Sequence, residues 1–343
     1  MLIRLLLLAL PVTGCMATAQ AQIPVLVGPA IVGAGTHPEP LYLSPGQIIT
    51  VYATGIGDKV TERIRATSQP WPTELSGISA ELIGPGWKPA IGQVEPLATC
   101  PEWGIIPNLR CGRLLAVTLQ VPFEINSELK MNSNFLLTLV LRDGDGNVTG
   151  AADVLPYKGQ PKILRYCEVA LLPNVNGVTR GASDCSPLVY HADGTRVHSA
   201  NPAKEDEPLT IYLYGLSEFA GLAYEGARTG YPAGRAIDMR ESYFMNYEFG
   251  DNVELTFGRS QPRLQADYIG TAPSEVGLFQ ANFRVPRIPS GVRPCGQTIA
   301  DPISNLSIGI GRGSLSENLK VSPKRLPFDW IGLCVDPASR RPD

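Results

Sequence analysis

The strongest constraint on the fold is an eight-residue phrase that occurs twice in nearly the same form. Residues 50–57 read TVYATGIG and residues 210–217 read TIYLYGLS. In both copies apolar and polar residues alternate, which is the pattern of a half-buried β-strand. Gly55 and Gly215 then end the strands, as a turn that needs positive φ would require. The residues expected on the apolar face are Ile49, Val51 and Ala53 in the first copy and Leu209, Ile211 and Leu213 in the second.

Two further strand patterns recur in the same order. Residues 115–122 (LAVTLQVP) resemble residues 279–286 (FQANFRVP), and both end in Val-Pro. Residues 135–142 correspond to residues 305–312, and another expected strand follows each, at 151–155 and 318–321. Three strand patterns in one order, about 160 to 170 residues apart, indicate a tandem duplication.

Short alternating segments and frequent turn residues predict an all-β fold. The chain contains 35 Gly and 31 Pro, which suit many tight turns, and no segment has a convincing amphipathic-helix pattern. We expect tandem immunoglobulin-like β-sandwich domains after a cleaved signal peptide, with a barrel as the alternative. The expected divisions are a first domain at 22–159, a linking segment at 160–189 and a second domain at 190–343.

The N-terminus predicts export. Arg4 precedes an apolar run at residues 5–12 that is too short to span a bilayer. Cleavage after Ala21 would remove residues 1–21, whereas the lipobox-like residues 12–15 would leave a lipidated Cys15 after removal of residues 1–14. Both alternatives remain open here. The expected location is secreted or in the cell envelope, with membrane contact only through such an anchor.

The other six cysteines predict disulfides, because an even number in an exported chain is typical of a cross-linked fold. The simplest scheme joins sequence neighbours, and no C-x-x-C spacing supports a zinc site. The expected pairs are Cys100 with Cys111, Cys167 with Cys185, and Cys295 with Cys334.

Two groups of residues are weak candidates for ligand or metal binding. Trp71, Trp87 and Trp103 lie beside Pro and Gly, where they either contact a ligand or cover the end of a core. Residues 143–147, DGDGN, resemble half of a calcium loop through Asp143, Asp145 and Asn147, but the distal Glu is missing. The same letters suit a hairpin turn.

No residue pattern predicts catalysis, a cofactor or nucleic-acid binding. His37, His191 and His198 lie in loops or turns without a nucleophile motif, so we expect solvated histidines. The net charge of −3 and the lack of a basic stripe give nucleic acid no electrostatic footprint.

The second half of the chain resembles a known family. Residues 190–217, YHADGTRVHSANPAKEDEPLTIYLYGLS, resemble its N-x-D-G-[ST] opening and its strand ending in Tyr-x-T-G-L-G. Residues 266–289 resemble its Tyr-Ala-Gly-x-A-P-G turn and the Gly-[LV]-x-Q-x-N-[VF]-x-[IV]-P strand. This is the Solibacter-type C-terminal domain of secreted acidobacterial proteins, matched over about residues 185–325 and more weakly over about 40–155.

The resemblance implies a secreted, immunoglobulin-like domain of unassigned activity, and it supplies no catalytic residues. His191 replaces an Asn of the family pattern, Tyr214 replaces a Thr, and Ser274-Glu275 replaces a Gly. We therefore expect a non-catalytic exported bacterial protein that acts in adhesion, partner binding or spacing. Its partner would be an extracellular protein or glycan. The alternative is a carbohydrate-binding or carbohydrate-active protein that uses the tryptophans of the first domain.

Overall fold

The computed structural model describes residues 25–26, 41–84, 86–97, 114–125, 137–149, 152–156, 159, 161–164, 187–216, 228–250, 262–273, 275–296, 304–312 and 328–342. Within these ranges the named elements are β-strands and one 3-10 turn, η3 (Pro337–Ser339). The protein is therefore all-β, as predicted. No helix in this part of the chain has the length and apolar character needed to cross a bilayer.

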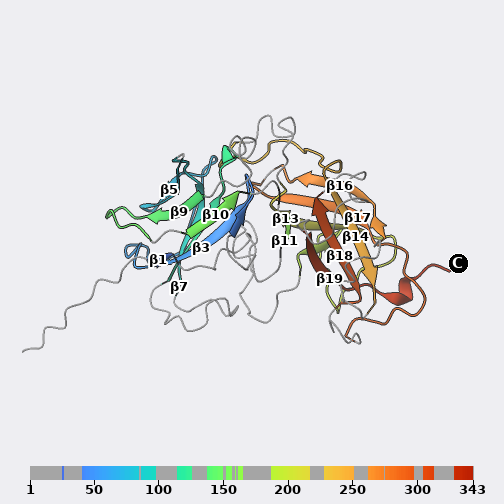
Figure 1. Cartoon of the computed structure of the whole chain (residues 1–343). Coiled ribbons are helices and arrows are strands. Elements are labelled where there is room, and N and C mark those ends of the chain that lie inside the picture. The colour runs from blue at the N-terminus through green and yellow to red at the C-terminus, as the bar shows by residue number, and fades with distance from the viewer. Residues whose placement is uncertain are drawn as a thin grey trace, which may run out of the picture.

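Two sheets form the first half of the molecule, drawn in blue to green in Figure 1. Sheet A has the order β1-β3-β8-β7-β4, and sheet B has the order β2-β10-β9-β6-β5. The strands pair antiparallel except β2 and β10, which are parallel. The strands of sheet A are β1 (Val25–Leu26), β3 (Ile48–Thr54), β8 (Leu114–Gln120), β7 (Ala90–Leu97) and β4 (Ile64–Arg65). Those of sheet B are β2 (Leu41–Leu43), β10 (Ala152–Pro156), β9 (Leu137–Arg142), β6 (Ile78–Ile83) and β5 (Glu74–Leu75).

Two further sheets form the second half, drawn in green and yellow to red. Sheet C has the order β11-β13-β17-β16, with β12 also paired to β13, and sheet D has the order β15-β14-β18-β19. The strands of sheet C are β11 (Lys162–Ile163), β12 (Val189–His191), β13 (Pro208–Tyr214), β17 (Phe279–Arg284) and β16 (Ala266–Thr271). Those of sheet D are β15 (Arg263–Leu264), β14 (Tyr243–Phe249), β18 (Leu306–Arg312) and β19 (Phe328–Leu333).

Each pair of sheets encloses its own hydrophobic core. Val51 of β3 and Leu139 of β9 meet in the core between sheets A and B, and both are fully buried. Ile211 of β13 and Ile308 of β18 do the same between sheets C and D. Because successive strand residues point to opposite faces, the predicted alternation places one side of every long strand in a core. Burying each such side chain contributes about 1.5–3 kcal/mol.

The two sheet pairs share their central neighbour order. The series β3-β8-β7 corresponds to β13-β17-β16, and β9-β6 corresponds to β18-β14. The pairing of Thr50 with Thr118 matches that of Thr210 with Asn282. The copies differ at one edge, because β5 precedes β6 in sequence whereas β15 follows β14. The expected strand at 318–321 lies outside the described residues, and β18 pairs instead with β19. The immunoglobulin-like classification remains a prediction.

A third apolar cluster, which we call the joint cluster, connects the two sheet pairs. From the first pair it contains Ile48, Trp71 and Ala90, and from the second Leu164, Leu188, Tyr214, Ala272, Val276 and Leu278. Leu164 follows β11, which lies in the range expected to be a linking segment but pairs with β13. Part of that range therefore belongs to sheet C.

Backbone contacts make the joint tight. Trp71 N–H donates to the carbonyl of Gly230 at 2.8 Å, and Gly230 N–H donates to Oε1 of Gln120 at 2.6 Å. A Cβ on Gly230 would lie 2.8 Å from the carbonyl oxygen of Trp71, and one on Gly277 would lie 2.7 Å from that of Gly46. Side chains larger than glycine do not fit there unless the backbones separate.

The C-terminal residues close the second sheet pair, an arrangement we call the C-terminal clamp. Cys295 and Cys334 form a disulfide, which confirms the third expected pair. Ala203 N–H donates to the carbonyl of Cys334 at 3.0 Å, and Asp336 N–H donates to that of Ala203 at 2.8 Å. Arg341 also pairs with Asp206 at 2.7 Å. The cysteines of the other two expected pairs, Cys100, Cys111, Cys167 and Cys185, lie outside the described residues, as do Cys15 and His37.

Candidate binding face

The outward face of sheet C carries a compact group of aromatic, hydroxyl and amide side chains. Thr210 and Tyr212 of β13 point away from the core because Leu209, Ile211 and Leu213 point into it. The pairing register places Asn282 opposite Thr210 and Gln280 opposite Tyr212, and β12 places Tyr190 opposite Thr210 on its other side. All five side chains are half-buried. We call Tyr190, Thr210, Tyr212, Gln280 and Asn282 the sheet C face.

Contacts within this face hold its side chains in fixed positions. The rings of Tyr190 and Tyr212 meet edge to face, with centroids 5.7 Å apart, and both pack against the joint cluster. The Thr210 hydroxyl donates to Oδ1 of Asn282 at 3.2 Å, which leaves the Nδ2 hydrogens of Asn282 available. Among the described residues, no hydrogen bond engages the amide of Gln280 or the hydroxyl of Tyr212. The face therefore combines rigid rings with available donors and acceptors.

The sheet C face is uncharged, and cations lie at its two ends. Lys162 pairs with Tyr214 at one end of β13, and Arg284 pairs with Pro208 at the other. The Arg284 guanidinium donates to the backbone carbonyl of Asp206 at 2.9 Å and lies 3.9 Å from its carboxylate. Arg284 is thus partly neutralised by a loop of its own domain.

The equivalent face of sheet A is closed. Thr50, Tyr52, Ala116 and Thr118 occupy the corresponding positions, and their exposed fractions are 1%, 3%, 5% and 2%. Thr50 and Thr118 share a hydrogen bond of 3.0 Å, as their counterparts do. The two copies therefore differ in accessibility and in two residues, because the second copy carries amides at Gln280 and Asn282.

Tyr214 departs from the repeat, and its place in the joint cluster explains why. Its counterpart is Thr54, at the end of the corresponding strand. Tyr214 is 1% exposed and belongs to the joint cluster, so its ring fills space between the sheet pairs that a threonine would leave empty.

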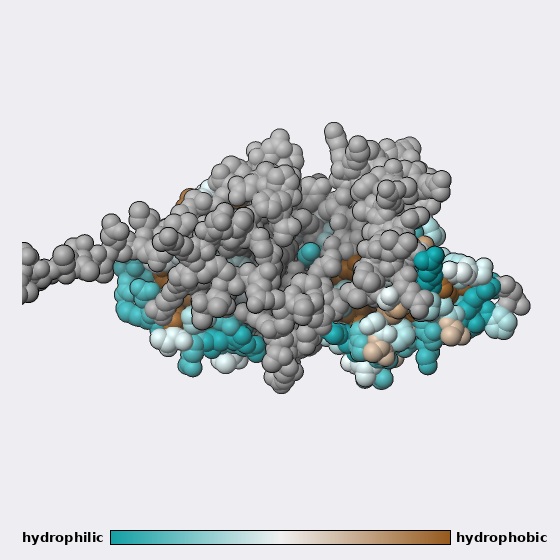
Figure 2. Space-filling view, turned by 90° about the horizontal axis from the view of Figure 1, so that it is seen from below, coloured by the Kyte–Doolittle hydropathy of each residue, from teal (hydrophilic) through white to brown (hydrophobic). Residues whose placement is uncertain are grey.

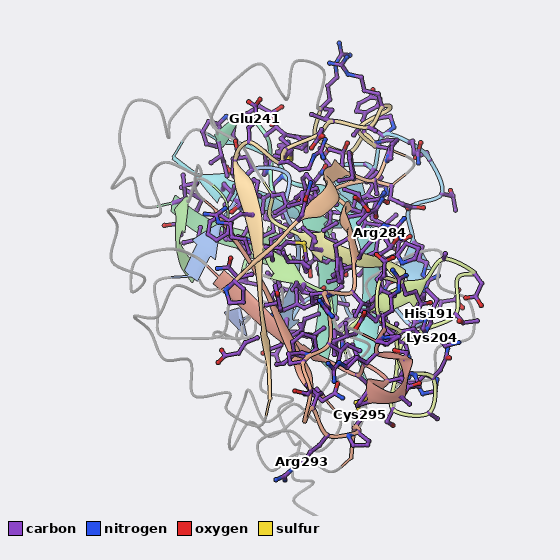
Figure 3. The ribbon with its side chains drawn as sticks, turned by 90° about the vertical axis from the view of Figure 1, so that its right-hand side faces the viewer. His191, Lys204, Glu241, Arg284, Arg293 and Cys295 are labelled. Carbon is purple, nitrogen blue, oxygen red and sulfur yellow. A yellow bond between two sulfur atoms is a disulfide. The ribbon has the colours of Figure 1, made fainter. Side chains whose placement is uncertain are left out.

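His191 lies beside the sheet C face and is buried, which corrects the expectation of a solvated turn histidine. Its exposed fraction is 8%. Nδ1 lies 2.6 Å from Oε1 of Glu207, and Nε2 lies 3.2 Å from the carbonyl of Asn201. Glu207 also accepts from the backbone N–H of Lys204, which Figure 3 shows next to His191. With both ring nitrogens engaged, the imidazole connects β12 to the turn before β13. His198 Nδ1 accepts from the backbone of Ala200.

The tryptophan candidates do not form an aromatic platform in the described part of the chain. Trp71 is 8% exposed and lies in the joint cluster, where it would meet any Cβ added to Gly92. Trp87 is half-buried and packs against the core of the first sheet pair. Trp103 lies outside the described residues. Trp71 and Trp87 therefore fit the alternative in which a tryptophan covers a core, although the sequence did not show which distant segments they contact.

The acidic turn at residues 143–147 is held by its own hydrogen bonds. Asp143 accepts backbone N–H groups of Asp145, Asn147 and Gly57, and also the side chain of Asn147. Burial alone would raise the pKa of the Asp143 carboxyl, but these bonds outweigh it and hold the pKa below its ordinary value of 3.8. Asp145 pairs with Lys59. The carboxylates of Asp143 and Asp145 are thus already engaged by hydrogen-bond donors of the protein. The described residues contain no group of three or more His, Cys, Asp and Glu that could hold a metal ion.

The sheet C face was not among the sites predicted from the sequence, although the strand pattern contains it. The alternating letters of TIYLY and FQANF, with Thr, Tyr, Gln and Asn at the outward positions, mark those residues. What was missing was the pairing register, which brings the two polar rows together. In the view of Figure 2 the described residues are mostly hydrophilic, with small hydrophobic areas between them.

Comparison with known proteins gives only distant likenesses. No protein-family model matches the chain, and neither does any curated protein. One similar solved structure is SGBP-B of the Bacteroides ovatus mixed-linkage glucan utilization locus, in complex with a mixed-linkage heptasaccharide. The identity is 12% and the TM-score 0.26, over 86% of this chain but 44% of that one, so this chain spans less than half its length.

A second is the sialic acid binding region of a Streptococcus sanguinis SK1 adhesin bound to 3'sLn. Here the identity is 8% and the TM-score 0.18, over 94% of this chain and 80% of that one. Both TM-scores are below 0.5, so neither likeness bears on the function of this chain.

Proposed function

We propose that this chain is an exported, non-catalytic binding protein of the bacterial cell envelope or extracellular space, and that the sheet C face is its binding surface. The observation that carries the proposal is the available polar groups of Gln280, Asn282 and Tyr212 on a rigid, half-buried sheet face. The centres of binding surfaces are poor in charged residues and rich in aromatic ones, and a few well-placed polar groups among them orient the ligand. The ligand is an extracellular glycan or protein.

Two features support a role without catalysis. The ring nitrogens of His191 already contact Glu207 and Asn201, so this imidazole does not offer a free base to a substrate. The sheet C face itself contains amides, hydroxyls and phenols, which bind but do not supply a general acid or base near neutral pH.

The joint cluster favours a second role as a spacer. Its backbone hydrogen bonds and closely packed glycines fix two sandwiches against each other, and such a pair holds a binding face at a set distance from an attachment point. An N-terminal lipid on Cys15 would provide that attachment, and a start at Gln22 would give a freely secreted form. Mass spectrometry of the mature N-terminus distinguishes the two.

Binding is tested with the oxidised mature chain on a glycan array and on immobilised cell-envelope proteins. The wild type is compared with a triple variant, Tyr212→Ala, Gln280→Ala and Asn282→Thr. We expect the wild type to bind a ligand that the triple variant no longer binds. Mass spectrometry should find this ligand chemically unchanged after incubation with the wild type. Equal binding by both proteins, or conversion of the ligand, would refute the proposal.

A further inference from the structure

The chemistry of the sheet C face identifies a class of ligand, on the assumption that this face is the binding surface proposed above. Its polar groups are amides and hydroxyls, which both donate and accept hydrogen bonds. Sugar hydroxyls have the same dual character. Gln280 and the Nδ2 group of Asn282 lie in neighbouring rows of β17, so they can contact successive hydroxyls along an extended ligand.

The tyrosines supply the apolar part of such a site. The axial C–H groups of a pyranose form an apolar surface that packs against an aromatic ring. Tyr212 lies opposite Gln280 and is held by its edge-to-face contact with Tyr190, so its orientation is fixed before a ligand arrives. A fixed ring avoids the entropic cost of ordering a side chain on binding.

The lack of charge on the sheet C face favours a neutral sugar over an acidic ligand, and its polar residues favour a sugar over a protein partner. None of the five residues of the sheet C face is ionised near neutral pH. Arg284 at one end already contacts Asp206, and Lys162 at the other end lies outside the five positions, so the face itself offers an acidic ligand no cation. A protein partner would bury a largely apolar interface core, whereas three of the five positions here are Thr, Gln and Asn.

We propose that the sheet C face binds an uncharged oligosaccharide, with the Tyr212 ring against a pyranose and the amides of Gln280 and Asn282 on its hydroxyls. The first copy of the fold supplies a comparison within the same molecule. It has Ala116 and Thr118 at the two amide positions, and its face is closed. The second copy thus differs from the first in the groups that recognise hydroxyls.

The test measures affinity of the full oxidised chain for neutral polysaccharides (xylan, galactomannan, soluble cellulose oligomers) and acidic ones (polygalacturonate, heparin). The double variant Gln280→Ala/Asn282→Thr installs the residues that the first copy carries in the same strand positions, so the fold has already accommodated them. Two lost hydrogen bonds predict about a five- to hundredfold weaker affinity. Tyr212→Ala predicts a loss of about tenfold or more. Tyr231→Ala removes a tyrosine that is 41% exposed outside this face, and should leave affinity unchanged.

The outcomes separate this inference from the proposed function. Neutral-glycan binding that is lost in the double variant, with an unchanged unfolding midpoint, supports both. Binding only to acidic glycans or to a protein, still sensitive to the face variants, overturns the neutral-sugar inference and leaves the binding function standing. Neutral-glycan binding that the double variant and Tyr212→Ala retain also overturns the inference. Failure to bind any glycan or envelope protein refutes both.

Discussion

Replacing Gly230 by alanine should uncouple the two sandwiches, because this residue lies where their backbones meet. Its φ is +85°, and a Cβ would lie 2.8 Å from the carbonyl oxygen and 3.0 Å from the nitrogen of Trp71. The substitution therefore strains the backbone and forces Trp71 away. The residue also makes two cross-joint hydrogen bonds, to Trp71 and Gln120.

The same loop provides a matched control. Gly234 has a φ of +71° and nothing within 4 Å of its would-be Cβ, so Gly234→Ala brings the backbone strain without the collision. Left-handed backbone costs a non-glycine residue about 1–2 kcal/mol, which applies to both variants. Loss of two hydrogen bonds adds about 1–3 kcal/mol to Gly230→Ala alone. We therefore expect the free energy of unfolding to fall by about 2–5 kcal/mol in Gly230→Ala and by about 1–2 kcal/mol in Gly234→Ala.

Calorimetry and small-angle scattering measure this effect. The wild type should unfold with the two sandwiches coupled, whereas Gly230→Ala should show two separated transitions and a larger radius of gyration. Gly234→Ala should keep the coupled transition at a slightly lower temperature. Equal effects of the two substitutions, or a Gly230→Ala protein with an unchanged single transition, would show that the joint does not couple the sandwiches.

Three further perturbations test the C-terminal clamp, the hydroxyl of Tyr268 in β16 and the acidic turn at residues 143–147. Replacing Cys295 and Cys334 by serine should lower the free energy of unfolding by about 4 kcal/mol on chain-entropy grounds, since the bond spans 39 residues. Urea titration of the oxidised wild type and the oxidised serine variant measures the difference, and equal unfolding midpoints would contradict it. Tyr268→Phe should lower the free energy of unfolding by about 1–2 kcal/mol, because the Tyr268 hydroxyl contacts the carbonyls of Ile237 and Thr271 at 3.1 and 2.8 Å. An unchanged midpoint of urea unfolding would contradict this. The pKa of Asp143 is lower in the folded chain than in the unfolded one, so its carboxylate stabilises the fold above about pH 4 and this contribution is lost as the pH falls through the folded-state pKa. Asp143→Asn should therefore be less stable at pH 7 and show a weaker acid dependence in urea unfolding, and a steeper one would refute the assignment.

The alternation of apolar and polar letters was sufficient to predict the long strands and their faces. Thr210 and Tyr212 point outward, and Ile211 lies in a core, as the pattern requires. The order of the repeated strands and the Cys295–Cys334 disulfide also agree with the sequence reading. These features depend on local periodicity or on one nearby pairing, which a single sequence contains.

Features that depend on contacts between distant segments, such as the burial of Trp71 and His191, could not be predicted from the sequence. Trp71 is buried because its backbone bonds to Gly230, 159 positions later in the chain, and no local letter reveals that contact. His191 is buried because Glu207 and Asn201 close around its ring. The sheet C face likewise exists only once β13 and β17 are in register. Periodicity assigns a residue to a face, but tertiary contacts decide whether that face is open.

The C-terminal clamp delays completion of the second half of the molecule until the last residues have been made. The first sheet pair has all its strands once Pro156 has emerged, whereas Ala203 waits for Cys334 and Asp336 near the end of the chain. At about 5–20 residues per second, this delay lasts on the order of 10 to 40 seconds. Over that interval Ile48 and Trp71 have no second sandwich to cover them. Until the second sandwich has folded, the first half thus exposes the apolar residues that it contributes to the joint cluster.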